Sequence, residues 1–105
     1  CGPLSSDPAY TMRTHPQPDP PRPPTGDVLA FLNLRGQPVS GATMCVAVDM
    51  LSMPMGMSRY MGHEISPGVY DDSVTFGMGG NWAGTLVLSV GGRPVASQPV
   101  SYRVS

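Results

Sequence analysis

Turn-forming residues at short intervals constrain this chain more than any other feature of its sequence. From Gly26 onward, runs that alternate apolar and polar residues are separated by glycine, proline and serine about every ten residues. The chain has 13 glycines and 13 prolines among 105 residues, and no long segment shows a helical apolar period. This pattern predicts an all-β fold, an immunoglobulin-like β-sandwich of about seven strands.

Alternating runs mark the individual strands. The expected strands cover residues 28–34, 43–49, 69–76, 82–90 and 93–97, with a terminal strand that ends at Val104. In the second run the charged Asp49 alternates with Met44, which places the Met44 side chain on the inner face. Gly91 and Gly92 predict a two-residue hairpin turn, because both tolerate positive φ.

The N-terminal quarter has a different composition. Residues 1–25 contain eight prolines, which cannot donate to a strand ladder and favour extended conformations. We therefore expect residues 1–25 to be a disordered, proline-rich tether and residues 26–105 to be the folded domain. A proline-rich ligand for a partner domain is the alternative interpretation.

The two cysteines suggest an exported protein. Cys1 and Gly2, followed by a polar stretch, resemble the start of a mature bacterial lipoprotein, in which the cysteine carries the lipid. We expect lipidation at Cys1 and a periplasmic or extracytoplasmic, membrane-anchored location; a cloning remnant is the alternative. An acylated Cys1 cannot pair with Cys45, so Cys45 is then expected to be a lone thiol sheltered on a strand.

Charge and motif content exclude several classes of function. The net charge is −1 and the six basic residues, all arginines, are scattered, which makes nucleic acid an unsuitable partner. No apolar run approaches the ~20 residues of a membrane span, so membrane contact is expected only through a lipid on Cys1. The predicted domain has one histidine and no Gly-x-Ser-x-Gly motif, and Asp71 and Asp72 are expected at an exposed acidic edge. We therefore expect no enzymatic activity.

Methionine is concentrated in one segment. Of eight methionines, five lie between residues 50 and 61, and His63 follows closely. Pro54 and Gly56 predict a loop there, and Met78 lies in a second glycine-rich stretch. Thioether sulfur is a soft, neutral donor that selects Cu(I) over hard cations. The candidate metal ligands are Met53, Met55, Met57, Met61, His63 and Met78.

Methionine clusters also occur without a metal. Flexible thioether side chains fill irregular cavities and form adaptable protein-binding surfaces. Packing, partner docking and Cu(I) binding therefore all remain open from these residues.

Three motifs resemble the YtkA-like family, which is related to FixH. They are Met-Pro-Met at 53–55, Gly-Val-Tyr at 68–70 and Phe-Gly-Met-Gly-Gly-Asn-Trp at 76–82, in that order, within residues 26–90. The resemblance implies an exported immunoglobulin-like domain of a kind often linked to copper handling. It also implies that Met53, Met55 and Met78 stand at the family's methionine positions and His63 at a nearby histidine. Met57 and Met61 are additional to the family pattern.

The expected function is therefore Cu(I) binding through a methionine-rich loop, for transfer or sequestration of copper. The expected partner is another exported copper-handling protein or a membrane complex. The alternative function is a structural or adaptor sandwich that docks a partner protein through its methionine surface, with no metal.

Overall fold

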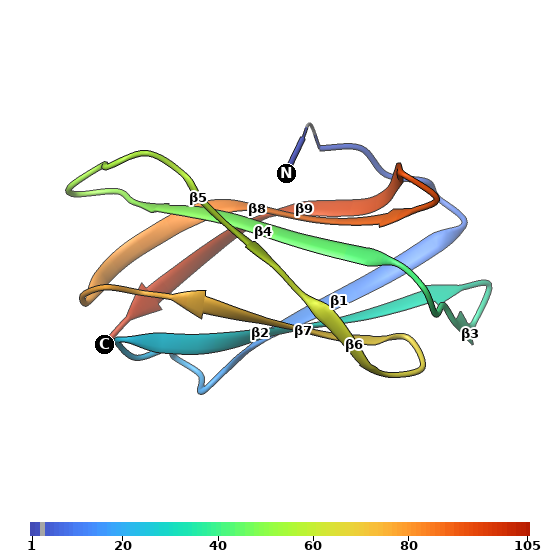
Figure 1. Ribbon diagram of the computed structural model, residues 1–105, viewed down its shortest axis with the longest axis horizontal. Coiled ribbons are helices and arrows are strands. Elements are labelled where there is room, and N and C mark those ends of the chain that lie inside the picture. The colour runs from blue at the N-terminus through green and yellow to red at the C-terminus, as the bar shows by residue number, and fades with distance from the viewer. Residues whose placement is uncertain (3) are drawn as a thin grey trace.

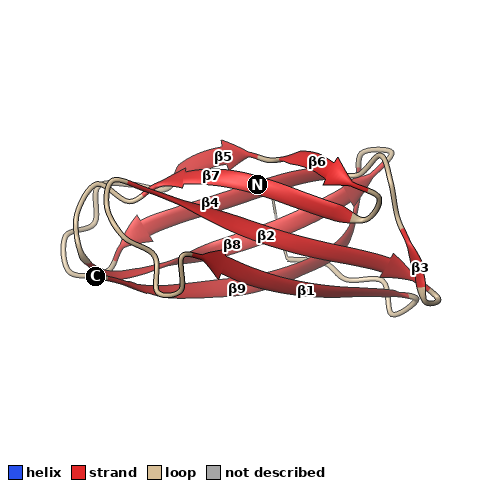
Figure 2. Ribbon diagram, turned by 90° about the horizontal axis from the view of Figure 1, so that it is seen from below, coloured by secondary structure: helices blue, strands red, loops and turns tan. Residues whose placement is uncertain are grey.

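Two antiparallel sheets packed face to face make up the protein (Figure 1). Figure 2 shows the same strands from below. The computed structural model describes residues 1–2 and 4–105. Across these residues there is no helix, and so no apolar helix long enough to cross a membrane. The predicted all-β fold is confirmed.

The strands of the described residues follow the chain in short steps. They are β1 (Tyr10–Gln17), β2 (Thr25–Leu34), β3 (Gln37–Pro38), β4 (Thr43–Met50), β5 (Ser58–Met61), β6 (His63–Ser66), β7 (Val69–Thr75), β8 (Gly80–Val90) and β9 (Arg93–Val104).

The strand order defines the type of sandwich. One sheet has the order β1-β2-β7-β6, with β3 beside β2, and the other has the order β5-β4-β8-β9. Immunoglobulin domains pair their strands as A-B-E-D and C-F-G, and β1-β2-β7-β6 and β4-β8-β9 reproduce these orders, with β5 added beside β4. The predicted immunoglobulin-like topology is therefore present.

Alternating side chains form the core between the sheets. Val28, Leu32, Met44, Val46 and Leu86 are completely buried, and all lie on inner faces. The predicted inner face of Met44 is confirmed. Aromatic side chains close one end of the core: the ring of Phe76 meets those of Trp82 and Tyr102 edge to face, at centroid distances of 5.5 and 5.9 Å.

One acidic residue is on the inner face as well. Asp72 lies between Tyr70 and Val74 in β7, pairs with Val28 across the sheet and has no exposed surface. The expectation of an exposed acidic edge is wrong for Asp72, because the β7 alternation directs every second side chain into the core.

The proline-rich segment contributes a strand. β1 pairs with β2 in continuous register from Tyr10 opposite Leu34 to Gln17 opposite Asp27, which corrects the expectation of a disordered tether over residues 1–25. Only Pro16 lies within β1, and β1 is an edge strand, where proline is tolerated. Five of the eight prolines of residues 1–25 fall in the β1–β2 connection.

A disulfide joins Cys1 to Cys45 on β4, across a sequence separation of 44 residues. The expectation of a lone Cys45 thiol is therefore wrong. The segment before β1 is also bonded to β9: Ser5 and the Ser97 hydroxyl exchange hydrogen bonds of 2.7 and 2.8 Å, and the Asp7 N–H donates to the Val95 carbonyl at 2.9 Å. A lipid thioether and this disulfide need the same Cys1 Sγ, so one molecule cannot carry both.

Between β5 and β6 the chain passes from one sheet to the other, as Figure 1 shows. The crossing occurs at Gly62, where an added Cβ would lie 2.8 Å from both the Asp71 carbonyl oxygen and the Met44 sulfur. Glycine is therefore required at this close approach, and Met61 and His63 on either side of it belong to different sheets.

Candidate functional site

Two loops meet at the end of the sandwich that also holds the C-terminus (Figure 1). One connects β4 to β5 and carries Met53 and Met55, and the other connects β7 to β8 and carries Met78. Together they line a hollow of about 380 Å³, which we call the methionine hollow. Met50, Tyr60 and Trp82 also line it.

Asp49 organises the β4–β5 loop. Its carboxylate accepts backbone hydrogen bonds from the N–H groups of Met50 at 2.8 Å, Met55 at 3.1 Å and Gly56 at 3.1 Å. Hydrogen bonding from Met55 is the largest cause that lowers the pKa of Asp49 below its ordinary value, so the acid remains ionised at neutral pH. Gly56 has a φ of +94°, a conformation that other residues rarely adopt. The carboxylate thus holds Met55 in a defined loop.

The second loop is fixed by different contacts. The indole N–H of Trp82 donates to the Met78 carbonyl at 3.0 Å, and the Phe76 N–H donates to the Pro24 carbonyl at 2.7 Å. The β4–β5 loop is tied to the start of β8, where the Leu51 N–H donates to the Asn81 carbonyl at 2.9 Å. Met78 is therefore presented from a supported backbone.

The predicted ligand set is divided by the fold. Met53, Met55 and Met78 share the methionine hollow, whereas Met57 lines a neighbouring hollow with Leu51 and Pro54. Met61 lies opposite Cys45 on β4, and His63 lies opposite Asp71 in the other sheet. Neither Met61 nor His63 lines the methionine hollow.

Sequence reasoning missed the supporting residues of this site. Met50 continues the inward alternation of Met44 and Val48, and at 9% exposure it forms part of the base of the hollow. The same alternation was a usable signal for Met50. The role of Asp49 had no such signal, because its bonds depend on the conformation of the loop that follows it.

The thioethers gathered here are soft, neutral donors, and the Asp49 carboxylate lines the same hollow. Met53, Met55 and Met78 are 52%, 86% and 47% exposed, so these residues are accessible to a ligand from solution. Across the described residues, no three His, Cys, Asp or Glu side chains gather in a way that could hold a metal ion. The methionine hollow therefore suits a soft monovalent cation better than a hard divalent one.

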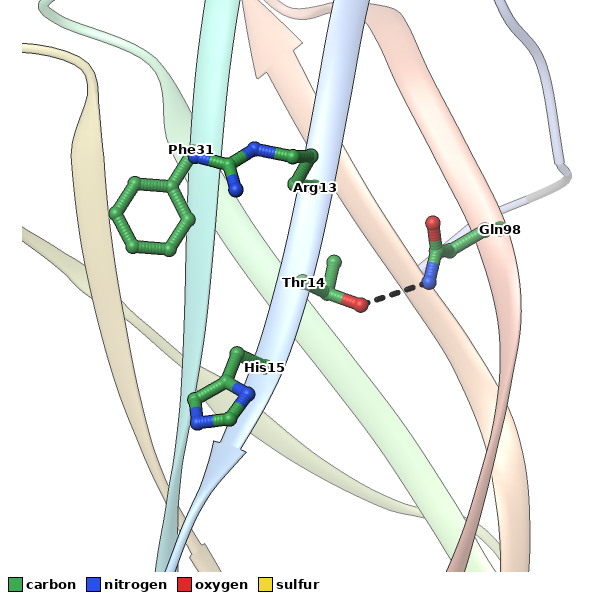
Figure 3. A pocket seen from close by; sticks show the side chains of 5 residues that line it. All are labelled: Arg13, Thr14, His15, Phe31 and Gln98. Atoms are coloured by element: carbon green, nitrogen blue, oxygen red, sulfur yellow. Dashed lines mark hydrogen bonds between the residues drawn. The ribbon is translucent and has the colours of Figure 1, made fainter. Parts of the chain in front are cut away.

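A third hollow, of about 580 Å³, lies where β1 approaches β9 (Figure 3). There Thr14 and Gln98 point toward each other, and the Gln98 amide donates to the Thr14 hydroxyl at 2.8 Å across the two sheets. The Arg13 guanidinium lies over the Phe31 ring, 5.0 Å from its centroid. His15 lies on the exposed side of β1 rather than in a tether. The residues of this hollow support the fold and offer no sulfur donor.

Fold and site together define a small immunoglobulin-like domain with a methionine-lined end. A scan against protein families matches the YtkA-like family model over residues 9–87, and the chain belongs to this family. The match includes β1, which agrees with the place of β1 in the sandwich. No curated protein and no solved structure gives a significant match to the chain.

Proposed function

We propose that this protein binds Cu(I) at the methionine hollow and passes it to, or withholds it from, another exported component. The observation that carries the proposal is the meeting of Met53, Met55 and Met78 from two separate loops around one hollow. Thioethers need no deprotonation, and they place no buried anion beside a monovalent cation.

Transfer rather than catalysis follows from the type of donor. The three methionines are exposed and their sulfurs are neutral, so a partner that offers competing sulfur ligands can replace them one at a time. The proposed partner is another exported copper-handling protein or a membrane complex. An oxidising, extracytoplasmic location is proposed with it, because Cys1 and Cys45 form a disulfide.

Lipid attachment at Cys1 stays a prediction from the sequence alone. Mass spectrometry of the native N-terminal peptide shows whether Cys1 carries a lipid or a disulfide. A disulfide to Cys45 leaves the protein without a lipid there, whereas an acylated Cys1 anchors it and leaves Cys45 as a thiol.

The alternative, a docking surface without metal, is favoured by the apolar character of the same end. Leu51, Met53, Met55 and Met57 are each at least half exposed, at 61%, 52%, 86% and 54%. A partner protein that covers these side chains would gain hydrophobic burial. Leucine at the methionine positions keeps apolar area and removes sulfur, so one set of variants separates the two functions.

The first prediction is that the oxidised protein binds about one Cu(I) per chain, because the exposed thioethers of Met53, Met55 and Met78 line one hollow. Cu(I) is generated with ascorbate, which leaves the disulfide intact, and binding is measured by competition with a chromogenic Cu(I) chelator. The triple variant Met53→Leu, Met55→Leu, Met78→Leu is expected to lose binding.

Met57→Leu is the matched control, because Met57 belongs to the same loop but lines the neighbouring hollow. It is expected to keep wild-type affinity. Undiminished Cu(I) binding by the triple variant would reject the methionine hollow as the site. Loss of partner capture in the triple variant would argue against docking by apolar area alone.

A further inference from the structure

We infer that reduction of the Cys1–Cys45 disulfide opens a second soft-metal site, formed by the sulfurs of Cys1, Cys45 and Met61. This site is separate from the methionine hollow and does not depend on copper binding there. It would take a soft monovalent cation, Cu(I) or Ag(I).

The register of β4 and β5 brings Met61 to the disulfide. Cys45 and Met61 are directly paired across the antiparallel strands. Directly opposite residues have Cβ atoms about 4.5–5.5 Å apart, within reach of a methionine side chain. The neighbouring pair, Val46 and Tyr60, faces the core, so Cys45 and Met61 share the outer face of the sheet.

All three residues of this group have exposed surface. Met61 is 67% exposed, far more than a methionine held in a core, and Cys1 and Cys45 are both partly exposed. A small reductant and a metal ion can therefore reach the group. Arg59, which pairs with Ala47 and lies two residues from Met61, is exposed on the same side and offers positive charge diagonal to Cys45.

Contacts other than the disulfide hold the N-terminal segment in place. Ser5 is bonded to Ser97, the Asp7 N–H is bonded to the Val95 carbonyl, and the Arg93 guanidinium lies 3.4 Å from the Asp7 carboxylate. Cys1 is four residues from Ser5, so these bonds limit how far its thiol can move from Cys45 after reduction. The two thiols therefore remain available to one ion.

Reduction of the disulfide and binding of the metal ion are two separate steps. A dithiol reductant transfers two electrons and two protons to the disulfide, which gives two thiols and leaves the reductant as a cyclic disulfide. Binding of Cu(I) by both cysteines then releases the two thiol protons, and Met61 adds a neutral third donor. The oxidised protein has no thiolate here and offers only one thioether.

The second prediction compares Ag(I) or Cu(I) titrations of oxidised protein with those of protein reduced by a dithiol and freed of it under anaerobic conditions. The reduced protein is expected to bind about one more equivalent than the oxidised protein and to release protons as it does so. Reduced Cys1→Ser is expected to lose this extra equivalent and the proton release. Reduced Met61→Leu is expected to bind it about tenfold more weakly, and Met57→Leu, at another exposed methionine, is the control.

The second site and the methionine hollow can be tested independently of each other. The triple Leu variant of the methionine hollow, when reduced, is expected still to bind the extra equivalent. Equal metal content in oxidised and reduced protein would overturn the second site, and an unaltered affinity in Met61→Leu would overturn the role of Met61. Loss of the Trp82 near-ultraviolet circular dichroism signal on reduction would also overturn it, because the site requires the folded sheet.

Discussion

Asp72 is a carboxyl group in a position where a sandwich ordinarily holds an apolar side chain. Its side chain has no exposed surface, and neither carboxyl oxygen has a hydrogen-bond partner in the described part of the chain. Burial, and next the charge of Asp71, raise the pKa of Asp72 to about 7. The Tyr102 hydroxyl is unpartnered as well, and burial followed by the charge of Asp72 raises its pKa to about 12. Folding therefore favours the protonated acid.

The third prediction is that stability falls as pH rises. The folded pKa of Asp72 lies above its unfolded value, so its favourable contribution is complete below pH ~4, declines toward pH ~7 and is lost above it. From pH 5 to pH 8, ionisation of Asp72 is expected to lower the free energy of unfolding by about 3 kcal/mol. Urea unfolding of wild type and Asp72→Asn at both pH values measures it. The variant has no proton to lose there, so a decline as steep as that of wild type would contradict the account.

At the scale of elements, the β4–β5 loop gains its shape from the strand that precedes it. Asp49 is the residue before the end of β4, and its carboxylate accepts hydrogen bonds from three N–H groups, two of them in the loop. The loop in turn carries Met53 and Met55. A carboxylate outside the sulfur set thus positions the sulfurs. Outer partners of this kind commonly change metal affinity by ten- to a hundredfold when removed.

The fourth prediction is that Asp49→Ala weakens Cu(I) binding about tenfold, although Asp49 donates no ligand atom. The matched control is Glu64→Ala, because the Glu64 carboxylate accepts N–H bonds from Gly41 and Gly68 in a different part of the fold. Competition titration of both variants gives the affinities, and circular dichroism confirms that both are folded. Equal affinities in the two variants would show that the loop needs no carboxylate.

Long strands were easier to predict from the sequence than short ones. The alternation of Met44, Val46 and Val48 identified a strand and its inner face, because one residue in two must be buried there. The strands β5 and β6 have four residues each and are separated by Gly62, too short to show a period. The sheet crossing at Gly62 also separates His63 from the methionine hollow, and nothing in the spacing of residues 50–63 reveals that crossing.

For the whole molecule, the main difference from expectation lies in the N-terminal quarter. The prolines of residues 16–24 suggested disorder for all of residues 1–25, but Tyr10 and Met12 pack against the core and β1 completes the first sheet. The disulfide then ties Cys1 to the outer face of the second sheet, a contact that depends on the folded chain and not on local sequence. The order of the three motifs predicted the family correctly. Members of one family share a strand order, so their loops follow one another in the same sequence.

The most direct test of the account is X-ray absorption spectroscopy on the oxidised protein loaded with one Cu(I). Because only methionine sulfurs among the soft donors meet in the methionine hollow, the fifth prediction is a copper coordination shell of sulfur alone. The triple Leu variant is expected to lose that signal. A shell containing imidazole nitrogen, or sulfur ligation that survives the triple Leu substitution, would contradict the central claim that Met53, Met55 and Met78 hold the ion.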